Sequence, residues 1–271
     1  MIIDAHHHLL NLKDYLPRLL EESARLGIDL VCLSALSDFP FLFSDGVSDL
    51  PGTISNEDVR RAFQQHPDRI VGFAYFRLGR DDPALVEDFH AQGFKALKVT
   101  RPTANYDDPS YYPVYQRAER LGMPILCHTG MLVRTVADKE YGASSARMRP
   151  VFLDTVARAF PDLNLIAAHL GVPWNEEAAA VARFNPNVYV DLTGAKGGWR
   201  NQKPVDFFRD LFAWWGGYEK IVFGTDVHYS EMEWVLEDQR RLFEALGIGE
   251  DTLARILGGT MSRLLRLGEA E

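Results

Sequence analysis

The chain lacks the features of secreted, membrane-spanning and nucleic-acid-binding proteins. It has only two cysteines in 271 residues, Cys32 and Cys127, and both lie in short apolar segments. This excludes a disulfide-stapled secreted domain, so we expect both to be reduced core residues. No apolar run reaches the roughly 18 residues of a membrane span, and the amino terminus does not look like a signal peptide. We therefore expect a cytoplasmic protein.

The chain also lacks an excess of positive charge. It contains 29 Lys and Arg against 38 Asp and Glu, which gives a formal net charge of −9. This balance argues against a nucleic acid or an anionic membrane as partner, because both attract basic surfaces. No low-complexity segment or shift in composition marks a linker. A hydrophobic content of 46% is enough for one large core, so we expect a single domain over residues 1–271.

Eight short apolar segments recur along the chain, with helical segments between them. Most are continuous rather than alternating in apolar residues, as in parallel strands that are covered on their outer face. The expected strands are 2–5, 30–34, 70–75, 96–99, 125–127, 163–168, 188–192 and 221–224. A doubly wound sheet is the alternative, but its Gly-x-Gly-x-x-Gly turn is absent after the first strand. The pattern therefore predicts an α/β fold, a (β/α)8 TIM barrel with its site at the carboxyl ends of the strands.

Several expected helices carry signals at their ends. A leucine-rich face begins at Leu12 and stops before Gly27, which is suited to a helix cap. Ser55 and Asp58 form a capping box before 59–65, and Asp82 precedes a proline as an expected N-cap. Further helices are expected over 113–121, 149–160, 176–184, 204–215, 231–246, 251–256 and 260–267.

Three consecutive histidines, His6, His7 and His8, directly follow the first expected strand. Because side chains alternate along a strand, His6 and His8 share one face with Asp4 and His7 points the opposite way. Two imidazoles on one face can converge on a single cation. A purification tag would not be so short or lie between two apolar runs. We interpret the pair as metal ligands and Asp4 as a supporting acid rather than a ligand.

Other polar residues follow later strands, at what would be the same rim of the barrel. His128 follows the fifth expected strand, His169 the sixth and Asp226 the eighth, and Lys98 lies late in the fourth. Each histidine alone could be a core residue bonded to the backbone. Together with the first pair they predict a metal site, and three nitrogens with one carboxylate suit zinc best, although manganese, iron or cobalt would also fit.

Four of these segments resemble motifs of the metal-dependent amidohydrolase superfamily. They are Asp4-Ala5-His6-His7-His8, Cys127-His128-Thr129-Gly130, Ala168-His169-Leu170-Gly171 and Gly224-Thr225-Asp226. The chain is most similar to the amidohydrolase-2 branch, which includes aminocarboxymuconate semialdehyde decarboxylase and related lactonases. The resemblance covers nearly the whole chain. It is specific for the fold and the metal site but not for the substrate.

The resemblance implies roles for these residues. The catalytic metal would be held by His6, His8, His128 and Asp226. His169 would be the catalytic histidine beside it, or a ligand to a second metal. In some members a carboxylated lysine at the end of strand four bridges two metals, and Lys98 is placed for that role or for orienting substrate. Thr100 stands where such members have a histidine, a departure that could alter the pocket.

From these roles we predict a metal-dependent hydrolase of a small molecule. A metal at this site lowers the pKa of bound water towards about 7. Asp226 would then take the proton of the water, and His169 would polarise the scissile carbonyl. The bond cleaved would be a C–O or C–N bond next to a carbonyl, as in a lactone or an amide.

Two other functions stay open at this point. A nonoxidative decarboxylase would use the same metal to bind a small carboxylate, and arginines near the mouth would favour it because a guanidinium grips a carboxylate at two places. The candidates for substrate binding are Lys98, Arg101, Arg134 and Arg147, with His228 at the mouth. The third function is a metal-binding scaffold without catalysis.

Two long segments, 37–53 and 129–148, are expected to cover the site, because loops of this length in a compact domain are usually lids or binding loops. The first contains an aromatic cluster at Phe39, Phe41 and Phe43, which could instead pack against a second subunit. Trp199, Trp214 and Trp215 are expected in the core or in an interface. A homodimer is therefore possible, with a small molecule as the substrate.

Overall fold

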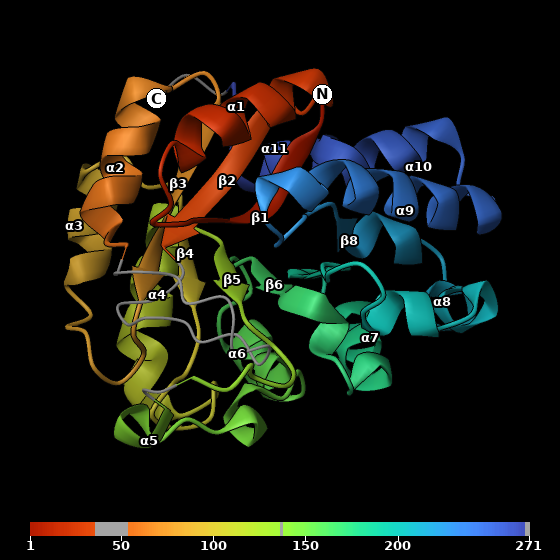
Figure 1. The fold of residues 1–271 in the computed structure, drawn as a ribbon. Coiled ribbons are helices and arrows are strands. Elements are labelled where there is room, and N and C mark those ends of the chain that lie inside the picture. The colour runs from red at the N-terminus through yellow and green to blue at the C-terminus, as the bar shows by residue number, and fades with distance from the viewer. Residues whose placement is uncertain (36–53, 136–137, 269–271) are drawn as a thin grey trace.

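The computed structural model describes residues 1–35, 54–135 and 138–268. Eight parallel strands form one sheet in chain order from β1 to β8, with helices around it (Figure 1). The last strand returns to the first: the amide of Ala5 donates to the carbonyl of Phe223 at 2.9 Å, and the amide of Asp226 donates to that of His6 at 2.8 Å. These bonds confirm the expected (β/α)8 barrel.

All eight expected strands are present, with small shifts at their ends. They are β1 Ile3–Leu9, β2 Leu30–Ala35, β3 Ile70–Phe76, β4 Ala96–Val99, β5 Ile125–Cys127, β6 Leu165–Ala167, β7 Val188–Asp191 and β8 Ile221–Val222. The largest difference is in β1, which runs through all three histidines instead of ending before them. His7 and His8 pair with Leu33 and Ser34 of β2, so the histidines are part of the barrel wall.

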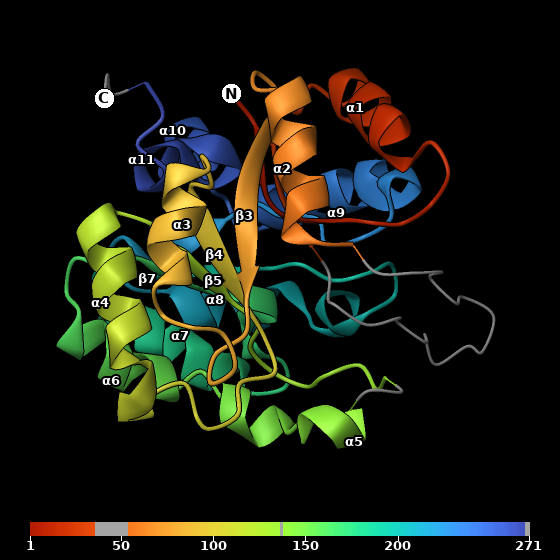
Figure 2. The same cartoon turned by 90° about the vertical axis from the view of Figure 1, so that its left-hand side faces the viewer.

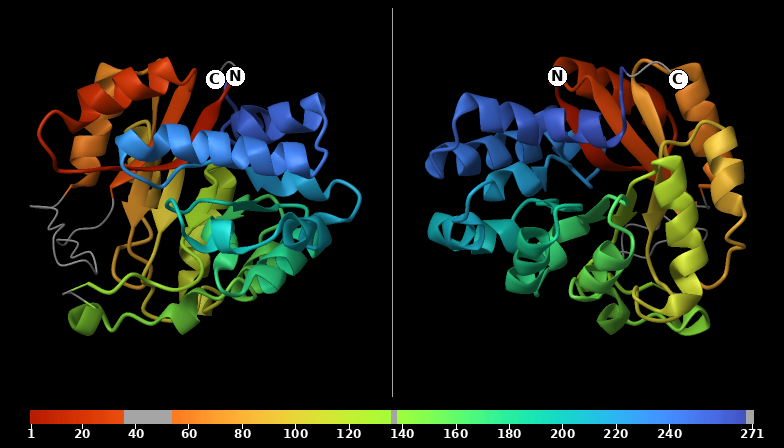
Figure 3. Two further views of the ribbon diagram at one scale, coloured as in Figure 1. Left: turned by 45° about the vertical axis from the view of Figure 1, so that its right-hand side comes forward. Right: turned by 180° about the vertical axis from the view of Figure 1, so that it is seen from behind.

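The helices cover the outside of the sheet (Figures 1 and 3). They are α1 Tyr15–Arg25, α2 Asn56–Gln65, α3 Leu85–Ala91, α4 Tyr112–Leu121, α5 Asp138–Tyr141, α6 Phe152–Ala159, α7 Asn175–Phe184, α8 Val205–Phe212, α9 Met232–Ala245, α10 Glu250–Ala254 and α11 Thr260–Leu264. Short turns of 3-10 helix lie at Pro109–Tyr111, Ser145–Met148, Ala168–Gly171, Trp199–Gln202, Gly217–Lys220 and Tyr229–Glu231, and a π-helical turn, Arg255–Gly259, joins the last two helices.

The predicted helix signals are confirmed to different degrees. The capping box is present: the amide of Asp58 donates to Oγ of Ser55, and the amide of Ser55 donates to the Asp58 carboxylate at 2.9 Å. Gly27 ends the first helix with φ of 69°, but that helix begins at Tyr15 rather than near Leu12. The third helix begins at Leu85, although the Asp82 carboxylate accepts from the amide of Ala84 as an N-cap would.

Strand β1 carries one more residue than its partner. Asp4 pairs with Val31 and His7 with Leu33, so three steps along β1 match two steps along β2. Ile3 and Ala5 face the apolar interior of the barrel, and strict alternation would send His7 there as well. The bulge reverses the alternation, because one extra residue moves the following side chains to the other face. His6 and His8 therefore reach the interior.

The two ends of the barrel differ in polarity. At the amino-terminal end, Met261 and Leu264 of α11 pack against inward-facing strand residues such as Phe73 and close the interior with an apolar plug. In Figure 2 the arrowhead of β3 points towards α5, whereas α11 lies at the opposite end. Along β4, Ala96 belongs to the apolar cluster, and Lys98, two residues further on, is buried at the carboxyl-terminal end. Polar side chains thus gather at the end where the site was predicted.

Other predictions concern residues that were not expected in the site. Cys32 and Cys127 are buried and unpaired, as expected. Trp215 is 99% exposed, so it is not a core residue. The predicted loop 37–53 with its phenylalanines lies outside the described residues. Within the described part of the chain, no helix is both long and apolar enough to cross a membrane.

Candidate metal centre

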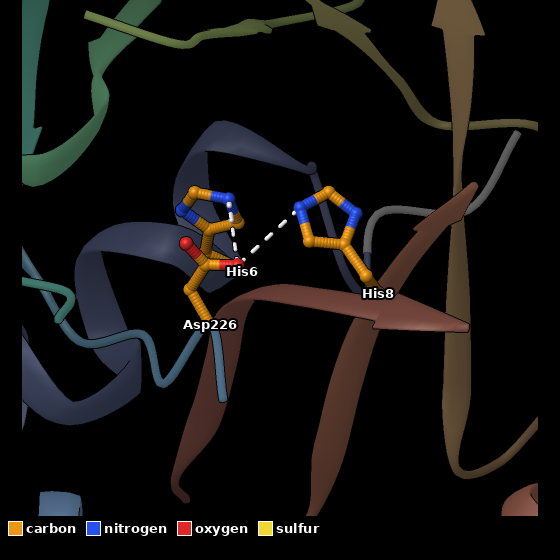
Figure 4. A group of neighbouring side chains, drawn as sticks. All are labelled: His6, His8 and Asp226. Atoms are coloured by element: carbon orange, nitrogen blue, oxygen red, sulfur yellow. Dashed lines mark ion pairs between the residues drawn. The ribbon is translucent and has the colours of Figure 1, made fainter. Parts of the chain in front are cut away.

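Three of the four predicted metal ligands converge at the carboxyl-terminal end of the barrel (Figure 4). Nε2 of His8 lies 3.4 Å from Oδ1 of Asp226, and Nε2 of His6 lies 3.7 Å from the same oxygen. The two histidines come from β1 and the carboxylate from the segment after β8. Their neighbour Gly224 allows this approach, since a Cβ there would lie 2.9 Å from Cβ of His6.

The outer nitrogens of both histidines are occupied, which aims the inner ones at one point. Nδ1 of His6 donates to Oδ2 of Asp191 at 2.8 Å. Nδ1 of His8 lies 3.2 Å from the carbonyl oxygen of Ala35 and 3.0 Å from Oγ of Ser34, and only a protonated Nδ1 can bond to the carbonyl. In each ring Nε2 is left to present its lone pair, which is the usual arrangement of metal-binding histidines.

The spacing of the three atoms fits a divalent metal ion. Two ligand atoms that each lie about 2.1 Å from a tetrahedral metal are about 3.4 Å apart. The observed separations of 3.4 and 3.7 Å are close to that value. The donor set of two imidazoles and a carboxylate is one that zinc and similar metals accept. These residues therefore fit the predicted metal.

The fourth predicted ligand, His128, lies beside His169 and outside this group of three. Its Nδ1 is 3.2 Å from Nε2 of His169, but its nitrogens do not fall within the group formed by His6, His8 and Asp226. Its Nε2 is buried and has no hydrogen-bond partner among the described residues. The role of His128 as a ligand stays a prediction. His169 faces the centre directly, with Nε2 3.6 Å from Oδ2 of Asp226.

The charges of the site follow from burial and from its neighbours. Burial alone would raise the pKa of Asp226, but His6, His8 and His169 together hold it well below its ordinary value, so the carboxylate is ionised at neutral pH. Burial lowers the pKa of His8, of His128 and of His169, so these rings are neutral at the same pH. Neutral imidazoles beside an ionised carboxylate are the protonation states that metal binding requires.

Lys98 reaches the centre from β4. Its Nζ lies 2.8 Å from Nε2 of His6, and Lys98 is buried, with 3% of its surface exposed. Burial lowers the pKa of Lys98, whereas the nearby Asp226 and Asp191 carboxylates act in the opposite direction. The amine thus faces the same nitrogen that would bind a cation. Thr100 lines the adjoining pocket, where its hydroxyl contacts Sδ of Met148 at 3.9 Å.

A pocket of about 790 Å³ opens above these residues. This volume is in the range of small-molecule sites. Its walls are largely apolar, and they include Met131, Leu132, Val133 and Trp199. The first three belong to the predicted covering loop 129–148, so the described part of that loop does line the site. His228 also lies on the wall, as the sequence predicted.

Only one of the three predicted substrate-binding arginines lines this pocket. Arg101 is 4% exposed, and its guanidinium donates to the carbonyl of Val133 at 3.1 Å and lies 3.4 Å from the Asp138 carboxylate. Arg147 instead donates to the carbonyls of Pro102 and Gly142, which hold it off the pocket wall. Arg134 is exposed and does not line the pocket. The structure therefore gives no support to the predictions for Arg134 and Arg147.

The backbone is strained where the site residues sit. Six non-glycine residues in the described part of the chain have positive φ, and three of them are predicted site residues: Arg101 (48°), His169 (58°) and Asp226 (49°). Left-handed conformations cost non-glycine residues about 1–2 kcal/mol, and such outliers cluster at functional sites. Each of the three follows a strand end, so the strain turns the side chain into the mouth of the barrel.

The comparison with family models decides the relationship that these motifs suggested. The model described as amidohydrolase matches residues 3–267. The chain belongs to the amidohydrolase family. Members of this family are metal-dependent enzymes, so this chain is an enzyme rather than a scaffold without catalysis.

Solved structures of other proteins share the fold of this amidohydrolase. An uncharacterised TIM-barrel protein from Bordetella bronchiseptica has a TM-score of 0.69 at 22% identity, over 98% of both chains. The 2,6-dihydroxybenzoate decarboxylase from Rhizobium has a TM-score of 0.65 at 18% identity, over 99% of this chain and 98% of that one. The 4-oxalomesaconate hydratase from Rhodopseudomonas palustris has a TM-score of 0.63 at 17% identity, over 98% and 96%. A search of curated proteins gives no match.

Sequence reasoning missed two residues of the amidohydrolase site, Asp191 and Thr193. Asp191 is fully buried at the end of β7, and Oγ1 of Thr193 lies 2.7 Å from Nδ1 of His169. Burial would raise the pKa of Asp191, yet His6 and the other hydrogen-bond donors hold it far below its ordinary value. The available signal was a charged residue inside an otherwise apolar strand, since buried charges are almost always paired.

His6, His169 and Asp191 also come close enough to resemble a second metal group. The distance of 2.8 Å between Nδ1 of His6 and Oδ2 of Asp191 is that of a hydrogen bond, and it is shorter than the spacing of two ligands around one ion. The group therefore orients the centre and does not form a second one.

The remaining predicted residue, Asp4, lies in a separate network behind the centre. Its carboxylate accepts from the amide and from Oγ1 of Thr225, at 2.9 and 2.5 Å. Oγ1 of Thr225 lies 2.9 Å from Nδ1 of His7, and Nε2 of His7 lies 3.0 Å from the Tyr15 hydroxyl. The supporting role predicted for Asp4 agrees with these contacts. The shared face with His6 and His8 was wrong, because the bulge breaks the alternation of β1.

Proposed function

We propose that this amidohydrolase is a nonoxidative decarboxylase of a small, largely apolar carboxylic acid. The observation that carries the proposal is Arg101, a buried guanidinium on the wall of a largely apolar pocket beside the metal centre. Arg101 also contacts Asp138, and a carboxylate substrate would bind the guanidinium more strongly than a neutral lactone or amide would. Two structural neighbours have carboxylic acids in their names, dihydroxybenzoate and oxalomesaconate, which supports the substrate class.

The residues of the site have complementary tasks in this reaction. A divalent ion, which we propose to be zinc, would be held by His6, His8 and Asp226 and would polarise the oxygens of the bound acid. Arg101 would orient the carboxylate, and the apolar walls around it would keep water away from the breaking bond.

The proton that decarboxylation consumes would reach the substrate through His169. Nε2 of His169 lines the pocket 3.6 Å from Oδ2 of Asp226, and it would first take a proton from water in the pocket and then give it to the substrate carbon. The bond between the carboxylate and its carbon breaks, carbon dioxide leaves, and the electron pair left on that carbon takes the proton. The products are carbon dioxide and the rest of the substrate with a hydrogen in place of the carboxylate.

The test is a product assay on the purified protein supplied with Zn²⁺ or Mn²⁺. Hydroxybenzoates and muconate-type acids are assayed for carbon dioxide, and lactones and amides for released acid. We expect carbon dioxide from an acid of the first group. Arg101→Met should lower kcat/KM by about 100-fold, with a partial return in Arg101→Lys, because removing a buried hydrogen-bonded charge pair costs about 2–5 kcal/mol.

Arg134→Met is the matched control, because Arg134 is exposed and does not line the pocket. It should leave kcat/KM unchanged. Turnover of lactones or amides with no carbon dioxide from any acid would overturn the proposal. An Arg101→Met variant with wild-type kcat/KM on the acid would remove its main support.

Hydrolysis of a C–O or C–N bond next to a carbonyl is the second candidate, and Lys98 favours it. Its Nζ lies 2.8 Å from Nε2 of His6, where the carboxylated lysine of two-metal family members would reach the centre. The mass of the intact protein in bicarbonate buffer, read with and without Zn²⁺, tests this. A metal-dependent gain of one carbon dioxide, lost in Lys98→Arg, would support two metals and a hydrolase. No such gain in mass, with or without Zn²⁺, would argue for a single metal and against this hydrolase.

A homodimer also remains a proposal. It comes from the aromatic segment of the sequence, and light scattering on the purified protein tests it.

A further inference from the structure

One carboxylate, that of Asp191, receives hydrogen bonds from two residues of the centre and from Thr193. Oδ2 accepts from Nδ1 of His6 at 2.8 Å. Oδ1 accepts from the amide of His169 at 2.7 Å, from the amide of Thr193 at 3.0 Å and from Oγ1 of Thr193 at 2.5 Å. An ionised carboxylate only accepts, so every one of these partners must donate.

This requirement fixes one hydrogen of His6. Its Nδ1 donates to Asp191 and therefore carries a hydrogen. A ring that binds a metal has one protonated nitrogen, so the nitrogen left for the metal is Nε2. The lone pair of Nε2 faces the point between His6, His8 and Asp226 where the metal fits.

The same carboxylate decides the state of His169 through a hydroxyl group. A threonine hydroxyl has a single hydrogen, and that of Thr193 is used at Asp191. At its contact with Nδ1 of His169, which measures 2.7 Å, the hydroxyl oxygen can therefore only accept. Nδ1 of His169 must carry the ring hydrogen. Its Nε2, 3.6 Å from Oδ2 of Asp226 and 3.2 Å from Nδ1 of His128, is then unprotonated.

We propose that Asp191 is a positioning residue that sets both His6 and His169 in the tautomer with hydrogen on Nδ1, the first directly and the second through Thr193. His6 is thereby held ready to bind the metal. Neutral His169 is a proton acceptor at its Nε2 and can give a proton only after it has received one. This differs from the expectation that His169 polarises a carbonyl as a donor. The inference rests on the metal centre and holds whichever bond the enzyme breaks.

The first test observes the tautomers directly in the metal-free wild-type protein. Ring nitrogens of ¹⁵N-histidine-labelled protein are observed by long-range ¹⁵N–¹H correlation, and the His6 and His169 signals are assigned with His6→Gln and His169→Asn. We expect protonated Nδ1 and unprotonated Nε2 in both rings. The opposite tautomer, which free histidine prefers, in either ring would overturn the proposal.

The second test separates the two arms of the network by substitution. In Asp191→Asn the amide nitrogen takes the place of one acceptor oxygen, so the Kd for Mn²⁺ should rise by about 10–100-fold, as when other outer partners of metal-binding histidines are removed. Thr193→Val should leave this Kd unchanged, because His6 keeps its acceptor, and should move His169 to the other tautomer. Thr193→Ser retains the hydroxyl and should behave as wild type in both measurements.

Several outcomes of this test would contradict the proposal. They are a wild-type Mn²⁺ affinity in Asp191→Asn, an unchanged His169 tautomer in Thr193→Val, and a Thr193→Ser variant that resembles the valine variant. If Asp191→Asn does not fold, the wild-type spectrum still tests His6 and the Thr193 variants still test His169. Neither measurement uses a substrate, so a failure here is separate from a failure of the decarboxylase proposal.

Discussion

Two buried networks in this barrel have the same order of groups: Asp4–Thr225–His7 and Asp191–Thr193–His169. In both, Oγ1 of the threonine donates to the aspartate at 2.5 Å and lies within hydrogen-bond distance of Nδ1 of the histidine. They differ at the far side of the ring. Nε2 of His7 lies 3.0 Å from the Tyr15 hydroxyl, whereas Nε2 of His169 faces Asp226 at the pocket.

The two rings have the same aspartate–threonine partners. What separates the structural histidine from the site histidine is therefore access to the pocket. His7 is fully buried and both of its nitrogens are bonded to protein groups. His169 lines the pocket, and its Nε2 contacts another site histidine, His128, at 3.2 Å. We call the first the Asp4 network and the second the Asp191 network. Substitutions in the Asp4 network should affect stability, and those at His169 should affect turnover.

The sharpest contrast is between His169→Asn and His7→Asn. His169→Asn should reduce kcat/KM by about 10²–10⁴-fold, the usual contribution of a proton-transferring group. His7→Asn should instead lower the free energy of unfolding by about 1–3 kcal/mol, because the hydroxyls of Thr225 and Tyr15 lose a buried partner. Urea unfolding and steady-state kinetics measure the two effects. An equal loss of turnover in both variants, with metal bound, would erase the distinction.

The next effect in size is that of Asp4→Asn. The Asp4 carboxylate accepts from Thr225 twice and from the amide of His6 at 3.2 Å. Hydrogen bonds to a charged group contribute about 1.5–3 kcal/mol, so we expect a loss of about 2–3 kcal/mol in the free energy of unfolding. Urea denaturation monitored by tryptophan fluorescence measures it. A fall in stability below 1 kcal/mol would mean that a neutral amide serves this network equally well.

A smaller effect is expected from Tyr15→Phe at the end of the Asp4 network. The substitution removes the hydroxyl that pairs with Nε2 of His7, and it keeps the ring that lines the pocket. The expected cost is about 1 kcal/mol, that of one neutral hydrogen bond. The Kd for Mn²⁺ should not change, and titration of the metal-free variant checks this. A weaker Mn²⁺ affinity would show that the two networks are coupled.

The smallest effect is expected on the surface, at Glu57 of α2, which serves as a reference for the buried carboxylates. Its hydrogen bond with Arg60 lowers the pKa of Glu57 to about 2. This folded-state pKa is below the unfolded value of about 4.3, so the stabilisation is present above pH 4.3 and disappears as the pH falls towards 2. Glu57→Gln should thus differ slightly from wild type at pH 7 and match it near pH 2. Thermal unfolding at both pH values measures the difference, and an unchanged difference near pH 2 would contradict it.

The sequence predicted the barrel well because its signals are local and repeated. Continuous apolar segments marked all eight strands, and the polar residues that end them pointed to one rim. His6, His8 and Asp226 meet there as expected. The alternation of side chains along β1 was a poorer guide, because a periodic pattern in the sequence does not reveal a bulge that adds one residue to a strand. The bulge sends Asp4 to a different network from the histidines that follow it.

The outer part of the site could not be predicted for a different reason. Asp191 acts through contacts with residues far away in the chain, and only the fold brings His6 and Asp191 together. The sequence could not rank the three arginines, because each lies in a predicted βα loop at the mouth of the barrel. In the structure only Arg101 lies on the pocket wall. The position of each arginine depends on the loop carbonyl groups to which it donates: Arg101 to Val133, and Arg147 to Pro102 and Gly142.

The seam between β1 and β8 has a consequence for how the protein matures. His6 stands near the start of the chain and Asp226 near its end, yet both must be present before an ion can be captured. During synthesis the first ligands leave the ribosome long before the last, so the group of three ligands is complete only after the eighth strand has emerged. An ion bound by this group would link the first and the last strand of the sheet.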